Sequence, residues 1–497
     1  MNNDNRITLN DLSSLYFRKS NTKDSNKILS KLPLIGPIEI SRSNVTEGRG
    51  LVASRDVEAG ECLFVTKPSS EAPVEEVRRV WLNKCKCGDD EFELTKKLEQ
   101  IAETILLKKT KRVLSKEISG GDNNEARNHR MAALSIVAQI GDHHTAESRD
   151  CYSLDDIDII ANNVNISSTS SSDCNDDVTN TKINIQKVAS KNDTILSIIR
   201  QNSFGPDFRH YQSIAKQWLT NQGENPYRRI LSLYPLAAMI NHSCKPNAVR
   251  VYTSSMDNDE SSEVMVAHAT QAIKQGEEIV WSYVPTTRPY HDRRKRIKET
   301  FGFDCICERC KAESSVFVNN DYDWLNYEKM VSGYEYWNEK AADLNQLPQY
   351  DQFRKMILSF EELLSDKRLP GETSRYLRSG MTTFYTNYFN ASLSNQIDQD
   401  AKLEILNLAS KIHLSLASVD HGNTEHLSIL HLCYELAAQQ RSKQNLSTFW
   451  SRQLQIAHEL RYGQLGNDVE RLRKVLIHSR GVLRQRQGFE EAQYCFI

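Results

Sequence analysis

LYPLAAMINHSCKPN, residues 233–247, is the stretch on which the interpretation of this 497-residue chain depends. Its apolar run ends at Met239 and Ile240 and passes directly into Asn241-His242-Ser243-Cys244, and Pro246 then prevents a simple continuation as helix or central strand. Polar residues placed directly behind buried ones form either a capped turn or a functional site. Two later stretches of the chain favour the site.

The first later stretch, GEEIVWSYV at 276–284, reads as a strand that ends in a tyrosine. The second, FGFDCICERC at 301–310, carries two phenylalanines and three cysteines. Together with residues 233–247 they supply an amide, an imidazole, a phenol and four thiols. We expect the fold to bring these three stretches together.

The composition describes an ordinary soluble protein, with 39% hydrophobic and 26% charged residues. A formal net charge of −2 gives no global attraction to nucleic acid or to an acidic membrane, so no direct binding to either is expected. The apolar runs fall short of the ~18 residues of a membrane span, and the start, MNNDNRITLNDLSS, lacks the apolar core of a signal peptide. We therefore expect a cytoplasmic or nuclear protein of two to four domains, in which the eleven cysteines are buried thiols or metal ligands rather than disulfides.

Short β-like runs begin at Ile38: IEISRS, GLVASRD and ECLFVTK. Polar and apolar residues roughly alternate in them, which predicts half-buried strands of a small twisted sheet. Between the first two runs, Gly48 and Gly50 allow unusual backbone conformations and close approach to a ligand. Taken alone, an ordinary hairpin turn is the better interpretation of this pair.

A helical period follows over residues 74–140. Leu94, Leu98, Ile101 and Ile105 share one face, and a second helix is predicted at 131–140. Residues 150–180 are rich in Asp, Asn, Ser and Thr, which indicates a disordered insertion loop. Helical patterns resume at 185–200 and 211–219.

The second half of the chain changes from strands to helices. AVRVYTS and EVMVAHA flank the acidic segment 257–263 and predict a β-hairpin, and 273–283 predicts a further strand. The basic segment 288–298 predicts a helix with a solvated face, with substrate steering as the alternative. Helices in an antiparallel repeat array are expected from residue 321 onward, at 401–417, 425–440, 446–460 and 468–486.

Cys305, Cys307 and Cys310 form C-x-C-x2-C, a spacing typical of a metal site rather than of independent core cysteines. Zinc takes four tetrahedral ligands, and Cys244 is the candidate for the fourth. Four thiolates leave no open coordination position, so this zinc would organise the structure without taking part in catalysis. Cys85 and Cys87 have no second pair nearby and are interpreted as ordinary cysteines.

GRGLVA, NHSCKPN, GEEIVWSY and the C-x-C-x2-C tail occur in the order found in SET-domain lysine methyltransferases. The chain most resembles the SMYD (SET and MYND) subgroup, on the further evidence of Asn202-Ser203-Phe204, the LYP of 233–235 and the helical C-terminal third. The motifs cover residues 38–311 with interruptions. The subgroup also carries a MYND zinc finger of seven cysteines and a histidine. Only Cys85 and Cys87 stand in that region here, so the resemblance is to a SMYD-like protein lacking the finger.

This resemblance implies an α+β fold of small twisted β-sheets with a helical insertion, a zinc-bound post-SET segment and an all-α, tetratricopeptide-like (TPR-like) C-terminal domain. The implied boundaries are 1–36 for a flexible N-terminus, 37–68 for the N-terminal part of the SET domain, 69–200 for the insertion, 201–284 for the SET core, 285–312 for the zinc segment and 320–497 for the helical domain.

The resemblance also implies S-adenosylmethionine as cofactor and a protein lysine entering an aromatic channel from the opposite face. The implied cofactor contacts are Gly48, Arg49, Gly50, Asn241, His242, Tyr283 and Phe303. Tyr283 matches the catalytic tyrosine, while Phe204 and Phe301 match walls of the channel, Phe301 standing where tyrosine is common. Aromatic walls suit this chemistry because lysine, with a pKa of about 10.4, is neutral only roughly once in 2,500 at pH 7.

The expected function is therefore methyl transfer to the ε-amine of lysine in a histone or non-histone protein. The alternative is a non-catalytic scaffold with a SET fold that binds protein partners through its helical domain. Asn241, His242 and Tyr283 favour the enzyme, because a pure scaffold has no chemical use for them. A SET enzyme of the type acting on abundant metabolic proteins is disfavoured by the four-cysteine site, which that group generally lacks.

Overall fold

The computed structural model describes fifteen parts of the chain, which are residues 34–43, 49–84, 90–119, 196, 199–200, 202–205, 215, 218–219, 229–254, 263–318, 347–365, 367, 369–394, 399–438 and 444–462. The predicted loop at 150–180, the predicted helices at 131–140 and 468–486, and the residues Gly48, Cys85 and Cys87 lie outside these ranges. None of the described helices combines the length and apolar character that crossing a membrane requires.

The described strands form small sheets of three or four strands, as expected for the α+β class. The first sheet has the order β1 (Leu34–Ile35), β4 (Cys62–Thr66), β10 (Glu263–Ala269), β9 (Ala248–Ser254). The second has the order β2 (Ile38–Arg42), β3 (Arg49–Ala53), β11 (Glu278–Trp281), β8 (Asn241–His242). The third has the order β5 (Ser70–Pro73), β7 (Arg229–Leu233), β6 (Ser203–Phe204).

The hairpin predicted from AVRVYTS and EVMVAHA is confirmed, because β9 and β10 pair antiparallel with Val251 opposite Val266. The strand predicted at 273–283 is shorter than expected, and β11 spans only Glu278–Trp281. It pairs antiparallel with β3 and parallel with β8, so that Trp281 lies opposite His242. This parallel pairing joins the polar cluster of 233–247 to the strand before Tyr283.

The prediction of half-buried strands is wrong for β4, whose five residues are all buried. Cys62 and Val65 pack in one hydrophobic cluster with residues of the C-terminal helices, whereas Leu63 and Phe64 pack in the cluster of the central sheets. Each face of the strand therefore meets a different part of the chain. Polar residues on either face would be desolvated, which explains the continuous apolar run CLFV.

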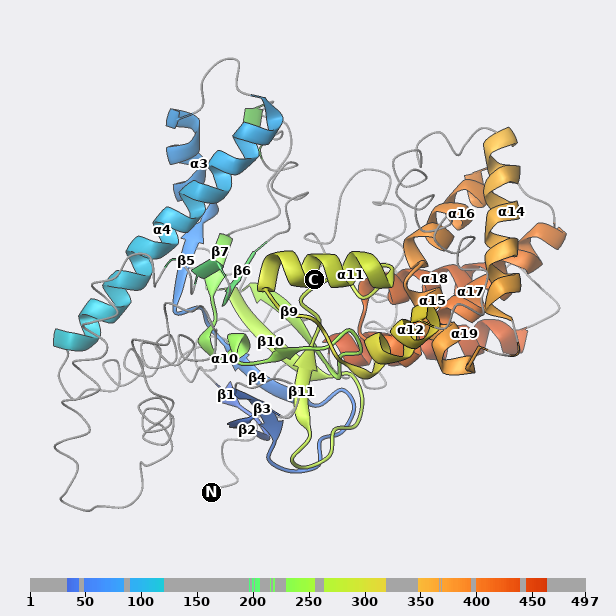
Figure 1. Ribbon diagram of the computed structural model, residues 1–497, viewed down its shortest axis with the longest axis horizontal. Coiled ribbons are helices and arrows are strands. Elements are labelled where there is room, and N and C mark those ends of the chain that lie inside the picture. Colours follow the sequence, from blue (N-terminus) through green and yellow to red (C-terminus); the bar gives the residue numbers. More distant parts are fainter. Residues whose placement is uncertain are drawn as a thin grey trace.

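Two helices, α3 (Val74–Lys84) and α4 (Glu91–Ser119), extend to one side of the sheets (Figure 1). The predicted apolar face is confirmed, since Leu94, Leu98, Ile101 and Ile105 are all at most 8% exposed. The Nε1–H of Trp81, on α3, donates to the Leu94 carbonyl at 2.9 Å and ties the two helices together.

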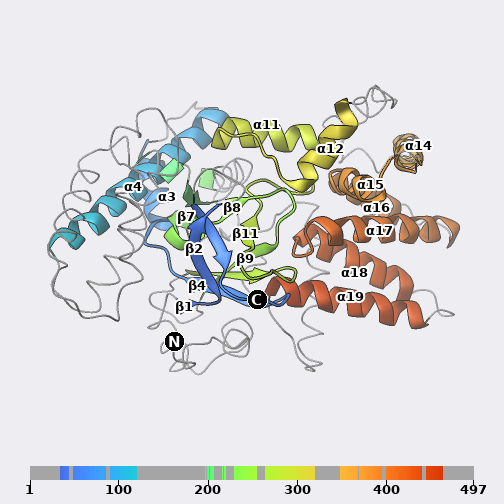
Figure 2. The ribbon, with the colours of Figure 1, turned by 60° about the horizontal axis from the view of Figure 1, so that its bottom comes forward.

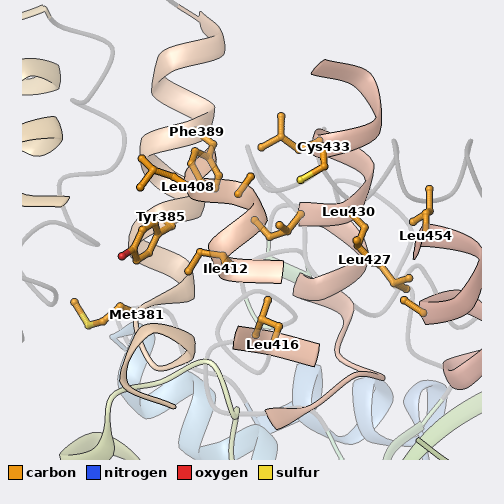
Figure 3. Packing of buried hydrophobic residues seen from close by; sticks show 14 of the residues in the cluster. Met381, Tyr385, Phe389, Leu408, Ile412, Leu416, Leu427, Leu430, Cys433 and Leu454 are labelled. Atoms are coloured by element: carbon orange, nitrogen blue, oxygen red, sulfur yellow. The ribbon is translucent and has the colours of Figure 1, made fainter. Parts of the chain in front are cut away.

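On the other side of the sheets lies the predicted helical region (Figure 1). It consists of α14 (Leu347–Leu364), α15 (Gly371–Ser379), α16 (Thr382–Ser394), α17 (Gln399–Val419), α18 (Thr424–Ala438) and α19 (Gln444–Tyr462). Helices α17, α18 and α19 lie side by side in one layer (Figure 2). Leu408 and Ile412 of α17 and Leu427 and Leu430 of α18 belong to one buried hydrophobic cluster (Figure 3).

The helical region closes directly on the sheets. Val251 and Val266, from β9 and β10, belong to the same buried cluster as the helices. The Thr286 hydroxyl donates to the Asp420 carboxylate at 2.8 Å, in the turn between α17 and α18. In that turn a Cβ on Gly422 would lie 2.8 Å from Thr270 Cγ2, so only glycine allows this close packing.

Candidate active site

The apolar part of residues 233–247 anchors the polar part. β7 ends at Leu233, and Pro235 opens a single helical turn, α10 (Pro235–Ala238), because its missing N–H is not needed in the first turn. The chain then enters β8, which places Asn241 and His242 beside β11. The predicted turn is thus present, and it places the polar residues Asn241 and His242 beside β11.

The His242 side chain connects two of the predicted elements. Its Nδ1 accepts the backbone N–H of Tyr283 at 2.9 Å, and its Nε2 lies 3.3 Å from the Cys244 sulfur. Since Nδ1 is the acceptor, Nε2 carries the hydrogen and donates a hydrogen bond to the sulfur. This imidazole therefore links the cysteine cluster to the segment that carries Tyr283.

Tyr283 stands at the centre of an aromatic group assembled from distant segments. Its hydroxyl donates to the Ile240 carbonyl at 2.7 Å. Its ring centroid lies 4.8 Å from that of Phe301, 5.2 Å from that of His242 and 6.5 Å from that of Phe303. Burial raises the pKa of the Tyr283 phenol above its usual range, so the group is a neutral hydrogen-bonding hydroxyl at neutral pH.

Gly50, Asn241 and the carboxylate of Glu278 meet beside this aromatic group. Asn241 Nδ2 donates to Glu278 Oε1 at 2.7 Å, and the Ser43 hydroxyl donates to the same carboxylate at 2.8 Å. A Cβ on Gly50 would lie 2.5 Å from Glu278 Oε1 and 2.8 Å from Asn241 Nδ2. Position 50 therefore requires glycine, because the backbone packs closely against these two side chains. The sequence had allowed either an ordinary hairpin turn or close approach to a ligand at this position.

Glu278 was missed as a site residue at the level of sequence, where GEEIVWSYV served only as a strand. It is 7% exposed and opens β11, whose other residues are apolar. A carboxylate at a buried strand position was the available signal, because such a group needs partners to be tolerated.

Of the remaining predicted residues, Phe204 and Phe303 contact different rings. The Phe204 ring packs edge-to-face on Trp281 at 5.8 Å and on Tyr234 at 5.7 Å. The Phe303 ring lies 6.0 Å from that of His242. The backbone of Arg49 is in β3, opposite Arg42, and Gly48 lies outside the described residues.

The four predicted cysteines come together. The sulfurs of Cys244, Cys305, Cys307 and Cys310 all lie within 4.8 Å of one another, and all four residues are buried. Cys244 and Cys310 are 3.6 Å apart at sulfur, far longer than a disulfide and close to the ~3.8 Å edge of a tetrahedron with 2.3 Å zinc–sulfur bonds. The donor set therefore fits a closed, structural zinc site.

Buried charge around the cluster also fits thiolate ligands. Arg293 of α11 (Tyr290–Phe301) and Arg309 of α12 (Glu308–Val318) are fully buried, and both bind the buried carboxylate of Glu313. Hydrogen bonding from the other three thiols and the charge of Arg293 hold the pKa of Cys244 well below its usual range. Two guanidinium groups against one carboxylate leave one positive charge, which offsets part of the net negative charge of four thiolates around a divalent ion.

The basic helix predicted at 288–298 forms as α11 and has the expected solvated face, on which the side chains of Arg294, Arg296 and Lys298 are 37%, 40% and 58% exposed. Arg293, however, is 0% exposed because its face packs on the cysteine cluster. Arg309 in addition donates to the carbonyls of Thr286 at 2.8 Å and Tyr376 at 3.1 Å, so it joins the cysteine segment to helix α15. The sequence shows the positive charges of helix α11, but it does not show that Arg293 alone among them is fully buried.

The family model of the SET domain matches residues 48–284, which contain β8, β11 and Tyr283. Residues 48–284 form a SET domain. The cysteine cluster is completed by the segment that follows this SET domain, and the helical region lies beyond it.

Several curated proteins are similar to part of the chain. Histone-lysine N-methyltransferase ASHR2 of Arabidopsis thaliana is 34% identical over 18% of the chain and 22% of its own length. A SET and MYND domain-containing protein of Dictyostelium discoideum is 26% identical over 33% of the chain and 37% of its own length. N-lysine methyltransferase SMYD2 of Homo sapiens is 35% identical over 16% of each protein. The matches thus span well under half of each of these relatives, and they place the SET domain among proteins related to the SET and MYND group.

Proposed function

We propose that this chain transfers a methyl group from S-adenosylmethionine to the ε-amine of a lysine in a protein substrate. The proposal depends mainly on one arrangement. The aromatic group around Tyr283 lies near the contact that Gly50 makes with Asn241 and Glu278. Its relatives named as lysine methyltransferases support the same reaction class. S-adenosylmethionine, when bound, supplies an activated methyl group on a positively charged sulfur.

Gly50, Asn241, His242 and Phe303 are the residues that would hold this cofactor. Gly50 packs closely on Asn241, and the hydrogen bond to Glu278 already orients the Asn241 amide. The orientation of this amide before binding reduces the entropy that is lost when a ligand is held. Phe303 offers an aromatic face near His242 for the adenine ring.

Tyr283 would position the lysine amine without removing its proton. Its phenol is neutral, and its hydrogen is engaged by the Ile240 carbonyl, so its oxygen remains as an acceptor for an amine N–H or a polarised methyl C–H. Phe204 and Phe301 would line the approach of the lysine side chain. Alignment of nitrogen, methyl and sulfur is the main catalytic requirement of this displacement.

The cysteine cluster would support the site indirectly. It fixes the segment that follows α11, and this segment carries Phe303 two residues before Cys305. Through His242 it also holds the backbone of Tyr283. A zinc ion at the four thiolates would therefore stabilise the aromatic group without contacting the reacting atoms.

Substitution Tyr283→Phe tests this assignment. We expect S-adenosylmethionine binding to be retained within a few-fold while methylation falls by about 10²-fold or more, since the oxygen acceptor is lost. The measurement is transfer of labelled methyl to a lysine-oriented peptide library, in which random residues flank a central lysine. An unchanged methylation rate would refute the role of Tyr283.

Calorimetry of S-adenosylmethionine binding to the zinc-loaded protein, repeated with Asn241→Ala, tests the cofactor site separately. Micromolar binding that is lost in the variant is the expected result. Absence of binding by folded wild-type protein would instead favour the scaffold and direct attention to the helical region.

A further inference from the structure

Arg250, on β9, holds its guanidinium against two aromatic rings of the candidate site. Its central carbon lies 5.3 Å from the ring centroid of Phe204 and 5.0 Å from that of Trp281. The two rings come from β6 and β11 and pack edge-to-face on each other. These two rings would attract the ammonium group of a substrate lysine, but the guanidinium of Arg250 already lies against them.

The charge of Arg250 is not neutralised by the described part of the chain. No described carboxylate pairs with it and no described group accepts a hydrogen bond from it, whereas Arg293 and Arg309 share Glu313. The side chain is only partly exposed, so solvent screens it incompletely. Arg250 consequently acts as a positive charge at a fixed place.

This charge reaches the place where the proposed reaction occurs. It lowers the pKa of the Tyr283 phenol against the larger opposite effect of burial, while Glu278 raises it. In the described part of the chain, the charged and titratable groups around Tyr283 are Arg250 from β9, Glu278 from β11 and His242 from β8; Phe301 from α11 is uncharged. The Glu278 carboxylate is held by Asn241 and Ser43 beside Gly50.

We propose that Arg250 favours the neutral amine of the bound lysine over its ammonium form and so sets the pH range of methyl transfer. The inference rests on the proposed function. A nearby positive charge raises the free energy of the ammonium and leaves that of the amine almost unchanged. The ammonium proton passes to solvent. The freed nitrogen lone pair then forms the N–C bond as the methyl–sulfur bond breaks, and sulfur keeps the bonding pair as an uncharged thioether.

The test is the pH dependence of kcat/KM for the full zinc-loaded chain with the lysine-oriented peptide library. Arg250→Met removes the charge and keeps much of the volume, Arg250→Lys keeps the charge, and Lys274→Met removes an exposed charge at the start of the β11 segment as a matched control. In Arg250→Met the acid limb of the kcat/KM profile should shift to higher pH by on the order of one unit. At pH 7 kcat/KM should be about tenfold lower, and its plateau at alkaline pH should be nearly unchanged. Arg250→Lys and Lys274→Met should follow the wild type.

An active Arg250→Met variant whose acid limb stays in place would overturn the inference, as would an equal shift in Arg250→Lys. If Arg250→Met does not fold, as judged by circular dichroism, Arg250→Gln replaces it. A second readout is the number of protons released when the peptide library binds, measured by calorimetry in two buffers of different ionisation enthalpy. The wild type should release more protons than the uncharged variant, and equal release would also overturn the inference. Absence of methylation by the wild type would count against the proposed function itself, whereas methylation with an unmoved limb counts against Arg250 alone.

Discussion

Single residues of the site show how closely its backbone is packed. Gly50 lies in β3, and any side chain there would enter the space of the Glu278 carboxylate and the Asn241 amide. Both groups are held by hydrogen bonds and cannot both move away without leaving buried polar atoms unpaired. The glycine is thus fixed by contact with polar groups and not by an unusual backbone angle.

Gly50→Ala should therefore lower the unfolding free energy by about 1–3 kcal/mol and weaken S-adenosylmethionine binding, since the new methyl displaces Glu278 and Asn241. Urea denaturation and calorimetry measure the two effects. Gly371→Ala is the matched control, because a Cβ at that position meets no atom within 4 Å. Equal stability of the two variants would contradict the packing argument.

At the scale of elements, helices α11 and α12 are held by buried charge. Arg293 and Arg309 belong to different helices, and Glu313 is their shared partner. Arg309 also reaches the Tyr376 carbonyl of α15, so this group of three joins the cysteine segment to the helical region. Removing the shared partner leaves two buried guanidinium groups with too few acceptors.

Glu313→Gln should accordingly cost about 3–5 kcal/mol of stability, because it breaks a buried ion pair from one side. It should also loosen metal binding, which zinc release to a colorimetric chelator would report. Lys274→Gln, which breaks an exposed pair with Asp56, should leave both measurements almost unchanged. A Glu313→Gln variant as stable and as slow to release zinc as the wild type would refute this role.

At the scale of the whole molecule, the SET domain and the helical region share a core and a buried histidine. His268 of β10 is 0% exposed and lies beside Arg461 of α19. Burial lowers the pKa of His268 to about 4, below the value of about 6.5 expected for an unfolded chain. The folded state therefore binds fewer protons than the unfolded state in acid, and this contribution to stability is complete above pH 6.5 and lost as the pH falls toward 4.

Between pH 7 and pH 4 the unfolding free energy should drop by about 3 kcal/mol through His268 alone. Buried His413, whose pKa burial also lowers to about 4, acts in the same direction. His268→Gln should flatten this pH dependence in part, whereas His291→Gln, at an exposed position, should not change its slope. Chemical denaturation at several pH values measures it, and identical slopes for wild type and His268→Gln would contradict the argument.

By itself, the sequence determined the local features of this protein. The spacing of Cys305, Cys307 and Cys310 predicted a metal site, the alternation around β9 and β10 predicted a hairpin, and the i, i+4 pattern from Leu94 predicted a buried helix face. These signals are readable because they arise from residues that are close along the chain. The order of the motifs added the SET domain, which the family model also matches.

Only the tertiary structure decided which charged groups would be buried and what they would contact. Ser43 and Glu278 are separated by 235 positions, and Arg250 meets Phe204 across two sheets. No periodicity records such pairs, because each depends on how separate elements pack. The same reason explains why β4 is buried on both faces and why Arg293 is not solvated: a strand or helix has a local pattern, but its neighbours supply the second face.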